Sequence, residues 1–167
     1  TLSRRAAHVV FSKILSKADA LCDCHGGDIT EDLGPFVIAR QGEDEELNRV
    51  AIEMAKCFPC KVIFARKGGH PGTTGVAGKE FGIPCITSEA GTPTRVREHL
   101  VKFHYDGIQN LLKYFGILEG KPVMSEAVIN PEGAYRAIAK QGGVWHYKVE
   151  LGQEVDAGQE LGNMTDL

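Results

Sequence analysis

The 167-residue sequence lacks three features that would point to a membrane or to nucleic acid. No apolar run approaches the roughly 20 residues that a membrane-spanning helix needs. The opening stretch, TLSRRAAHVVF, has no small-residue cleavage site, and its apolar and polar positions alternate, so no signal peptide is expected. Positive charge is not in excess, since the net charge is −3 and the pI is about 6.1. We therefore expect neither a membrane nor a nucleic acid as a partner.

Cysteine is also scarce, with five residues in a chain that is large enough to fold without disulfides. An odd number of cysteines favours reduced thiols and a cytoplasmic protein. The hydrophobic fraction of 43% and the charged fraction of 25% are ordinary for a globular protein. The length allows one domain with a substantial core, or one domain with a small appendage.

Hydrophobic periodicity predicts helices that alternate with short apolar strands. We expect helices over 3–17, 42–58, 74–82 and 95–116, and strands over 18–25, 61–66 and 83–89. This alternation indicates an α/β fold with a mostly parallel, mixed sheet and helices on both faces. After residue 120 the pattern changes to short alternating segments with glycines at 152, 158 and 162, which predict a small β-rich appendage.

His25 is the first candidate site residue, because it ends an apolar strand and precedes Gly26 and Gly27. Ligands of open α/β sheets bind at the carboxyl ends of strands, and a neutral imidazole is the commonest zinc ligand. Its second nitrogen would need a partner, and Asp23 and Asp28 both remain candidates. The glycines would let the backbone turn and leave room for a substrate. A hydrogen-bonded histidine with no metal is the simpler alternative.

Glu89 is the second candidate, because it closes the strand CITSE and is followed by Ala-Gly. A carboxylate at the end of an apolar strand is poorly solvated, which raises its pKa toward the range useful to a general base. The alternative is a solvated loop glutamate. His25 and Glu89 are 64 positions apart, so only the fold can bring them together.

The cysteines allow two other hypotheses, and a glycine-rich loop allows a third. Cys57 and Cys60 form a C-x-x-C motif, but it follows a helix and precedes a strand, opposite to the order in thioredoxin-like folds. A zinc knuckle built from these two with Cys22 and Cys24 has irregular spacing. The loop 67–75, KGGHPGTTG, lacks the phosphate-binding spacing, so we interpret it as a flexible loop lining a pocket.

Three segments in the same order resemble the succinylglutamate desuccinylase and aspartoacylase family of zinc-dependent amidohydrolases. These segments are ADALCDCHGGDITEDLGPFV, GIPCITSEAGTP and HYDGIQNLLKYFGILEG. The resemblance implies a carboxypeptidase-like α/β core over 1–120. It also implies that residues 121–167 are the first part of a β domain similar to lipoyl and biotinyl carriers.

Carried over by position, the resemblance makes His25 a zinc ligand and Glu89 the catalytic general base. The family's first two zinc ligands lie in an H-x-x-E motif, and its substrate-binding Asn-Arg pair also lies upstream of the region matched here. We therefore expect this chain to be truncated at both ends relative to the family.

The resemblance implies hydrolysis of the amide bond of N-acyl amino acids or related N-acyl amines, of the desuccinylase or deacetylase type, with Zn²⁺ as the cofactor. Lys79, Arg66 and Arg95 are the candidates to bind the substrate carboxylate. Two other functions stay open: a non-catalytic binding module of the same fold, and a thiol oxidoreductase that uses Cys57 and Cys60. The acyl group, the amino acid and a homo-oligomeric state are not specified by the sequence.

Overall fold

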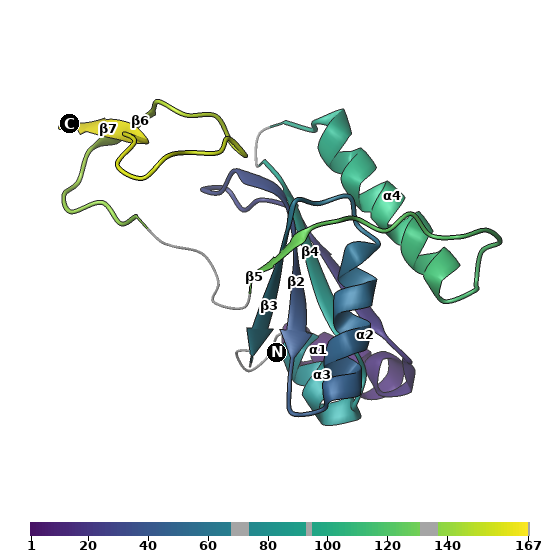
Figure 1. Cartoon of the computed structure of the whole chain (residues 1–167). Helices are drawn as coiled ribbons and strands as arrows, with labels where there is room; N and C mark the ends of the chain where they lie inside the picture. The colour runs from purple at the N-terminus through teal and green to yellow at the C-terminus, as the bar shows by residue number, and fades with distance from the viewer. Residues whose placement is uncertain (68–73, 93–94, 131–136, 167) are drawn as a thin grey trace. The chain divides into compact units, whose positions relative to one another are not determined.

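The computed structural model describes residues 1–67, 74–92, 95–130 and 137–166 (Figure 1). Its contacts divide the chain into two compact units, residues 1–133 and residues 134–167. Each unit is described by itself below.

The first unit is built on a mixed five-stranded sheet in the order β1-β4-β2-β3-β5. The strands are β1 (Leu21–His25), β2 (Leu33–Gln41), β3 (Val62–Lys67), β4 (Cys85–Gly91) and β5 (Val128–Asn130). The pairs β1–β4, β2–β3 and β3–β5 are parallel, and only β2–β4 is antiparallel. The predicted mostly parallel, mixed sheet is therefore confirmed.

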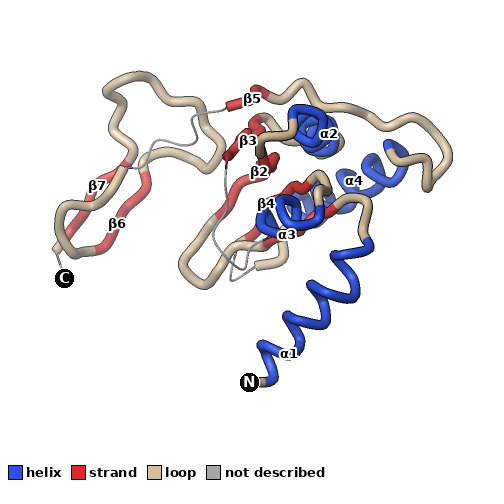
Figure 2. The backbone as a smooth tube through the Cα atoms, turned by 90° about the horizontal axis from the view of Figure 1, so that it is seen from below, coloured by secondary structure: helices blue, strands red, loops and turns tan. Residues whose placement is uncertain are grey.

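Helices lie on both faces of this sheet, as predicted (Figure 2). They are α1 (Leu2–Val9), which continues as a π-helical turn (Val10–Ile14) and a 3₁₀ turn (Leu15–Lys17), and α2 (Glu45–Lys56), α3 (Thr74–Phe81) and α4 (Glu98–Tyr114). Asp44 caps the N-terminus of α2, because its Oδ1 accepts hydrogen bonds from the backbone N–H groups of Glu46 and Leu47. Figure 2 shows α2 and α4 on the same side of the sheet, and α3 contacts β4 from the other side.

The main hydrophobic core lies between the sheet and the pair α2 and α4. It contains Val37, Ala39, Ala51, Met54, Ala55, Cys57, Phe58, Cys60, Ile63, Ile86, Ala90, Leu100, Phe103 and Leu111. Phe58 is fully buried, and its ring packs 5.5 Å from that of Phe103. The same ring lies against the backbone of α4 at Gly107, where a Cβ atom would overlap the ring. On the opposite face of the sheet, α3 packs against β4, and this face also carries the polar residues described below.

Replacement of Gly107 with alanine is expected to destabilise the first unit by about 1–3 kcal/mol, because the new methyl group overpacks the core at Phe58. Alanine in a helix interior normally stabilises by about 1 kcal/mol relative to glycine, so a loss must come from this contact. Chemical denaturation measures the change. The control is the same substitution in a Phe58→Leu background, where Gly107→Ala should lower the free energy of unfolding by less. An equal loss in both backgrounds would show that the contact with Phe58 is not the cause.

Several apolar residues of the predicted helices are exposed. Val9, Val10 and Ile14 of the first helix are exposed. Val96 lies within the predicted helix 95–116, but it is 90% exposed and precedes α4, which begins only at Glu98. Phe115 is also exposed, because it follows the end of α4.

Two strands of the sheet were not predicted, β2 and β5. β2 occupies the centre of the sheet and carries the buried residues Val37, Ile38 and Ala39. β5 pairs with β3, so the segment after residue 120 still belongs to the first unit. Because of this pairing, the first compact unit extends to residue 133, whereas the boundary was expected at 120–121.

The second unit contains a short antiparallel hairpin, consistent with the predicted β appendage. Its strands are β6 (Val144–Tyr147) and β7 (Gly162–Thr165). The rings of Trp145 and Tyr147 pack edge to face at 6.3 Å, and both are exposed. Across the residues that are described, no helix is long and apolar enough to cross a membrane.

Candidate functional site

His25 and Glu89 meet at the carboxyl ends of two neighbouring parallel strands. β1 and β4 pair so that His25 lies directly opposite Glu89. Directly opposed residues on neighbouring strands point to the same face of a sheet, and their side chains are close enough to interact. His25 Nδ1 lies 3.2 Å from Glu89 Oε1. The structure therefore brings together the two residues that the sequence singled out.

Asp23, and not Asp28, is the acidic partner on the other nitrogen of His25. Residues two apart on a strand share a face, so Asp23 points to the same side as His25. Its Oδ2 lies 3.1 Å from His25 Nε2. Asp28 instead accepts a hydrogen bond from the backbone N–H of Ile29 within its own loop. The imidazole thus lies between two carboxylates, Asp23 on one nitrogen and Glu89 on the other.

Glu89 is the least exposed of these three side chains. It is 13% exposed, against 34% for Asp23 and 48% for His25. Burial raises the pKa of Glu89, the proximity of His25 opposes this rise, and the acidic side chains of Glu31 and Asp23 add to it. A carboxylate with a raised pKa is a stronger base when it is ionised, which suits proton abstraction.

Gly27 has a different structural role from the one expected. Its backbone φ is not positive, so it does not supply a left-handed turn. Instead, the loop after β1 crosses the end of β4 with backbone against backbone. A Cβ atom at Gly27 would lie 2.5 Å from the carbonyl oxygen of Gly91, whereas one at Gly26 would meet nothing within 4 Å. Gly27 therefore allows the ends of β1 and β4 to approach each other beside His25 and Glu89.

A second polar cluster, Cys24 with Ser88 and His104, lies on the opposite face of β1 and β4. Ser88 Oγ lies 3.1 Å from His104 Nδ1, and His104 Nε2 lies 3.2 Å from the carbonyl oxygen of Ala90. Hydrogen bonds with Cys22 and His104 lower the pKa of the Cys24 thiol, and the bond with Cys24 raises the pKa of His104. His104 lies within the predicted helix 95–116, and no sequence signal places it in this cluster.

The remaining cysteines do not form a redox centre of the usual kind. Cys57 and Cys60 are buried free thiols, and burial raises their pKa values to about 12 and about 11. A reactive thiol needs a lowered pKa and some exposure, so this environment argues against the thiol oxidoreductase hypothesis. Within the described ranges, no group of three or more His, Cys, Asp or Glu side chains is placed to hold a metal ion.

The three cationic candidates lie in different places. Arg66 is on β3, with its guanidinium 5.3 Å from the centre of the Phe64 ring. Lys79 is exposed on α3, and Arg95 is exposed just before α4. A fourth cation, Arg40 on β2, was not predicted from the sequence, because β2 itself was not expected. Arg40 is half-buried and lies in register with Arg66.

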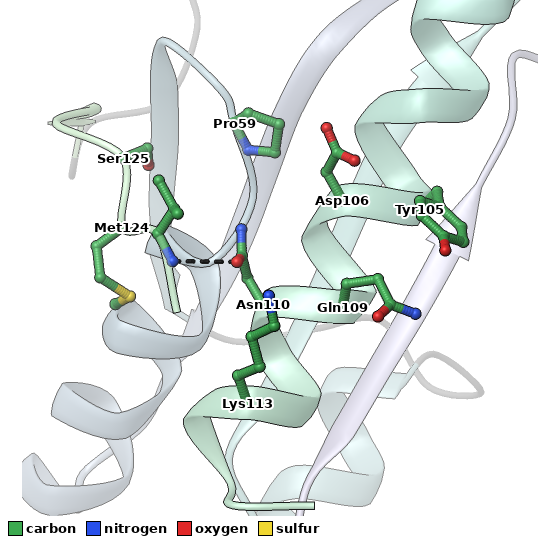
Figure 3. Close-up of a pocket in the computed structure, with 9 residues that line it drawn as sticks. Pro59, Tyr105, Asp106, Gln109, Asn110, Lys113, Met124 and Ser125 are labelled. Carbon is green, nitrogen blue, oxygen red and sulfur yellow. Dashed lines mark hydrogen bonds between the residues drawn. The ribbon is translucent and has the colours of Figure 1, made fainter. Parts of the chain in front are cut away.

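Among the residues that the structure describes, His25 and Glu89 line neither of two hollows that lie near α4. The larger, of about 520 Å³, lies between α4 and the segments around Pro59 and Met124 (Figure 3). Asn110 lies between these parts, because its amide donates to the carbonyl oxygen of Cys57 and accepts from the backbone N–H of Val123. The smaller hollow, of about 180 Å³, includes Arg95 and His104. Most of the loop 67–75, expected to line a pocket, lies outside the described residues.

Comparison with known proteins gives consistent matches to one family. Residues 1–115 match the family described as the succinylglutamate desuccinylase/aspartoacylase catalytic domain. A curated relative, N-alpha-acetyl-L-2,4-diaminobutyric acid deacetylase of Halomonas elongata, is 27% identical in an alignment 164 residues long that covers 94% of this chain and 48% of the relative. The chain thus spans about half the length of the curated relative it matches.

Two solved structures have the same fold. A succinylglutamate desuccinylase from a Silicibacter species superposes with a TM-score of 0.86 at 24% identity, over 99% of this chain and 51% of that chain. A succinylglutamate desuccinylase/aspartoacylase from Rhodobacter sphaeroides gives a TM-score of 0.84 at 25% identity, again over 99% and 51%. Both matches include the strands that carry the paired histidine and glutamate.

Proposed function

Because the chain belongs to the succinylglutamate desuccinylase/aspartoacylase family, we propose that it forms part of a zinc-dependent hydrolase that cleaves the amide bond of N-acyl amino acids. The observation that supports this most directly is the contact of His25 Nδ1 with Glu89 Oε1 at 3.2 Å, at the matching ends of β1 and β4. A histidine and a poorly solvated carboxylate at one strand rim are the parts that a hydrolytic site needs.

The donor set around His25 suits a zinc ligand. A metal-binding histidine usually donates its second ring N–H to a carboxylate, which fixes the ring and raises its basicity. Asp23 is placed to accept that bond, since its Oδ2 lies 3.1 Å from Nε2. His25 would then hold the ion through Nδ1, in place of the contact that this nitrogen now makes with Glu89 Oε1. When bound, zinc would supply Lewis-acid polarisation of the acyl carbonyl and a lowered pKa for a water molecule. The other ligands would come from outside the described residues.

Glu89 is the proposed proton carrier. Its carboxylate would take the proton of the attacking water molecule and then give it to the nitrogen of the leaving amine. Partial burial favours this role, because it raises the pKa of Glu89 above that of an ordinary glutamate. The backbone contact between Gly27 and Gly91 would keep Glu89 next to His25 throughout the reaction. The products would be a free carboxylic acid and a free amino acid.

The test is an assay of the complete protein with Nα-acetyl-L-2,4-diaminobutyrate and N-succinyl-L-glutamate, the acyl compounds to which the relatives' names refer. We expect release of the free amino acid from at least one of them, detected by chromatography of the reaction products. Dialysis against 1,10-phenanthroline should abolish the release, and one equivalent of Zn²⁺ per chain should restore it.

A folded complete protein that binds no zinc and hydrolyses neither compound would contradict the proposal. That result would favour the non-catalytic binding module of the same fold. Mass spectrometry of the metal content and circular dichroism of the same preparation separate this outcome from simple unfolding.

A further inference from the structure

Phe36 lies next to Glu89, on the side away from His25. The strand order places β4 between β1 and β2. In the register of these strands, Glu89 lies directly opposite His25 on β1 and directly opposite Phe36 on β2. Directly opposed residues share a face of the sheet, so the three residues form one row across three strands. Neighbouring strands lie about 4.8 Å apart, so this row is roughly 10 Å long.

Phe36 belongs to an apolar surface on this face of the sheet. Its ring lies edge to face with that of Phe64 on β3, with 5.3 Å between the ring centres. Ile38 lies opposite Phe64 and two residues beyond Phe36, so it shares the same face. Phe36 and Phe64 are half-buried, whereas Phe58 and Phe103 in the main core are almost fully buried. Part of an aromatic surface is therefore open beside the proposed general base.

The order of the row determines which part of a substrate would meet Phe36. His25 is the proposed zinc ligand, so the acyl carbonyl would lie at its end of the row. Glu89 is the proposed donor of a proton to the leaving nitrogen, so that nitrogen would lie beside its carboxylate. In a planar trans amide, the group on the nitrogen points away from the acyl chain. The amino acid, and not the acyl chain, would therefore reach Phe36.

We propose that Phe36, supported by Phe64, binds the side-chain methylene groups of the amino acid that the reaction releases. This inference rests on the proposed function and adds to it a residue that selects the amino acid. Each methylene group buried against an apolar surface strengthens binding by roughly 3- to 4-fold. The amino acids of the two assay compounds, 2,4-diaminobutyrate and glutamate, both have two side-chain methylene groups.

The test measures binding and not turnover, in the complete protein with Glu89→Gln to prevent hydrolysis. Isothermal titration calorimetry compares N-acetyl-L-alanine, N-acetyl-L-2-aminobutyrate and N-acetyl-L-norvaline, whose side chains lengthen by one methylene group at a time. We expect affinity to rise by roughly 10-fold over the series when Phe36 is intact. With Phe36→Ala the rise should fall below about 3-fold, because the added methylene groups lose their contact. Phe36→Leu should keep most of the rise, since leucine is still apolar.

Phe11→Ala is the matched control. Phe11 also belongs to a half-buried aromatic pair, with 4.6 Å between its ring centre and that of Phe81. Phe81 ends α3 just before β4 begins, so this pair lies at the opposite end of β4 from Glu89. The full rise in affinity should remain in this variant, and thermal unfolding confirms that every variant is folded.

Four results would overturn the inference. They are a full rise in affinity with Phe36→Ala, equal weakening of all three ligands by that substitution, no rise with Phe36 intact, and no binding of any of the ligands with Phe36 intact. Failure of the proposed function is read separately, as absence of hydrolysis with Glu89 intact.

Discussion

Replacement of Glu89 with glutamine should lower kcat for hydrolysis of the acyl amino acid by roughly 10²- to 10⁴-fold, the range that general acid–base catalysis contributes. The amide has nearly the same size as the carboxylate, but it cannot accept a proton from water. KM should change little, because Glu89 is assigned to the reacting proton and not to substrate binding. Steady-state kinetics on the complete protein give the two constants separately.

Glu31→Gln is the control for this prediction. Glu31 is one of the acidic side chains that raise the pKa of Glu89, and its carboxylate accepts a hydrogen bond from the backbone N–H of Asp28. The substitution removes the same charge from the same region while it leaves the proposed base in place. We expect a change of less than about 5-fold in kcat, since a nearby charge acts only through modest electrostatics. Equal losses in both variants would assign the effect to charge alone.

From the sequence, His25 and Glu89 could be placed only at the same edge of the sheet, and their direct contact could not be predicted. Each residue ends an apolar strand, and parallel strands present their carboxyl ends at one edge. That β1 and β4 are direct neighbours does not follow from the sequence. Strand order is set by how α2, α3 and α4 pack on the sheet, and the two strands are joined only through a long intervening segment.

β2 was missed for a local reason. Its first residues include Gly34 and Pro35, which are both unfavourable in the interior of a strand. Its buried part is the short run Val37–Ala39, which also fits a loop or the start of a helix. Because Arg40 follows this run, this half-buried cation was missed together with the strand.

The cluster of Cys24, Ser88 and His104 could not be predicted for a different reason. Cys24 and Ser88 face each other across β1 and β4, so strand pairing places them. His104 comes from α4, and its rotation about the helix axis depends on the packing of Leu100 and Phe103 in the core. Only tertiary packing determines that this histidine reaches Ser88, so the sequence pattern alone could not assign it.

The second large effect is expected for Gly27→Ala, which should lower kcat/KM by roughly 10²-fold although residue 27 touches no reacting group. A Cβ atom there would lie 2.5 Å from the carbonyl oxygen of Gly91 and 2.6 Å from that of Glu31. Backbone atoms cannot rotate away as a flexible side chain can, so the loop after β1 must move. A displacement of about 1 Å between catalytic groups is enough for a 10²-fold loss.

Gly26→Ala separates this mechanism from a general effect of alanine in the loop. The two glycines are adjacent and follow His25 directly, but a Cβ atom at Gly26 meets nothing within 4 Å. We therefore expect activity within about 2-fold of the parent for Gly26→Ala, with thermal unfolding showing both variants folded. Because an added Cβ atom would clash with the end of β4 at residue 27 and not at residue 26, unequal losses would show that activity depends on the spacing of His25 and Glu89. Equal losses of activity in the two variants would show that the close approach of the two backbones is not the cause.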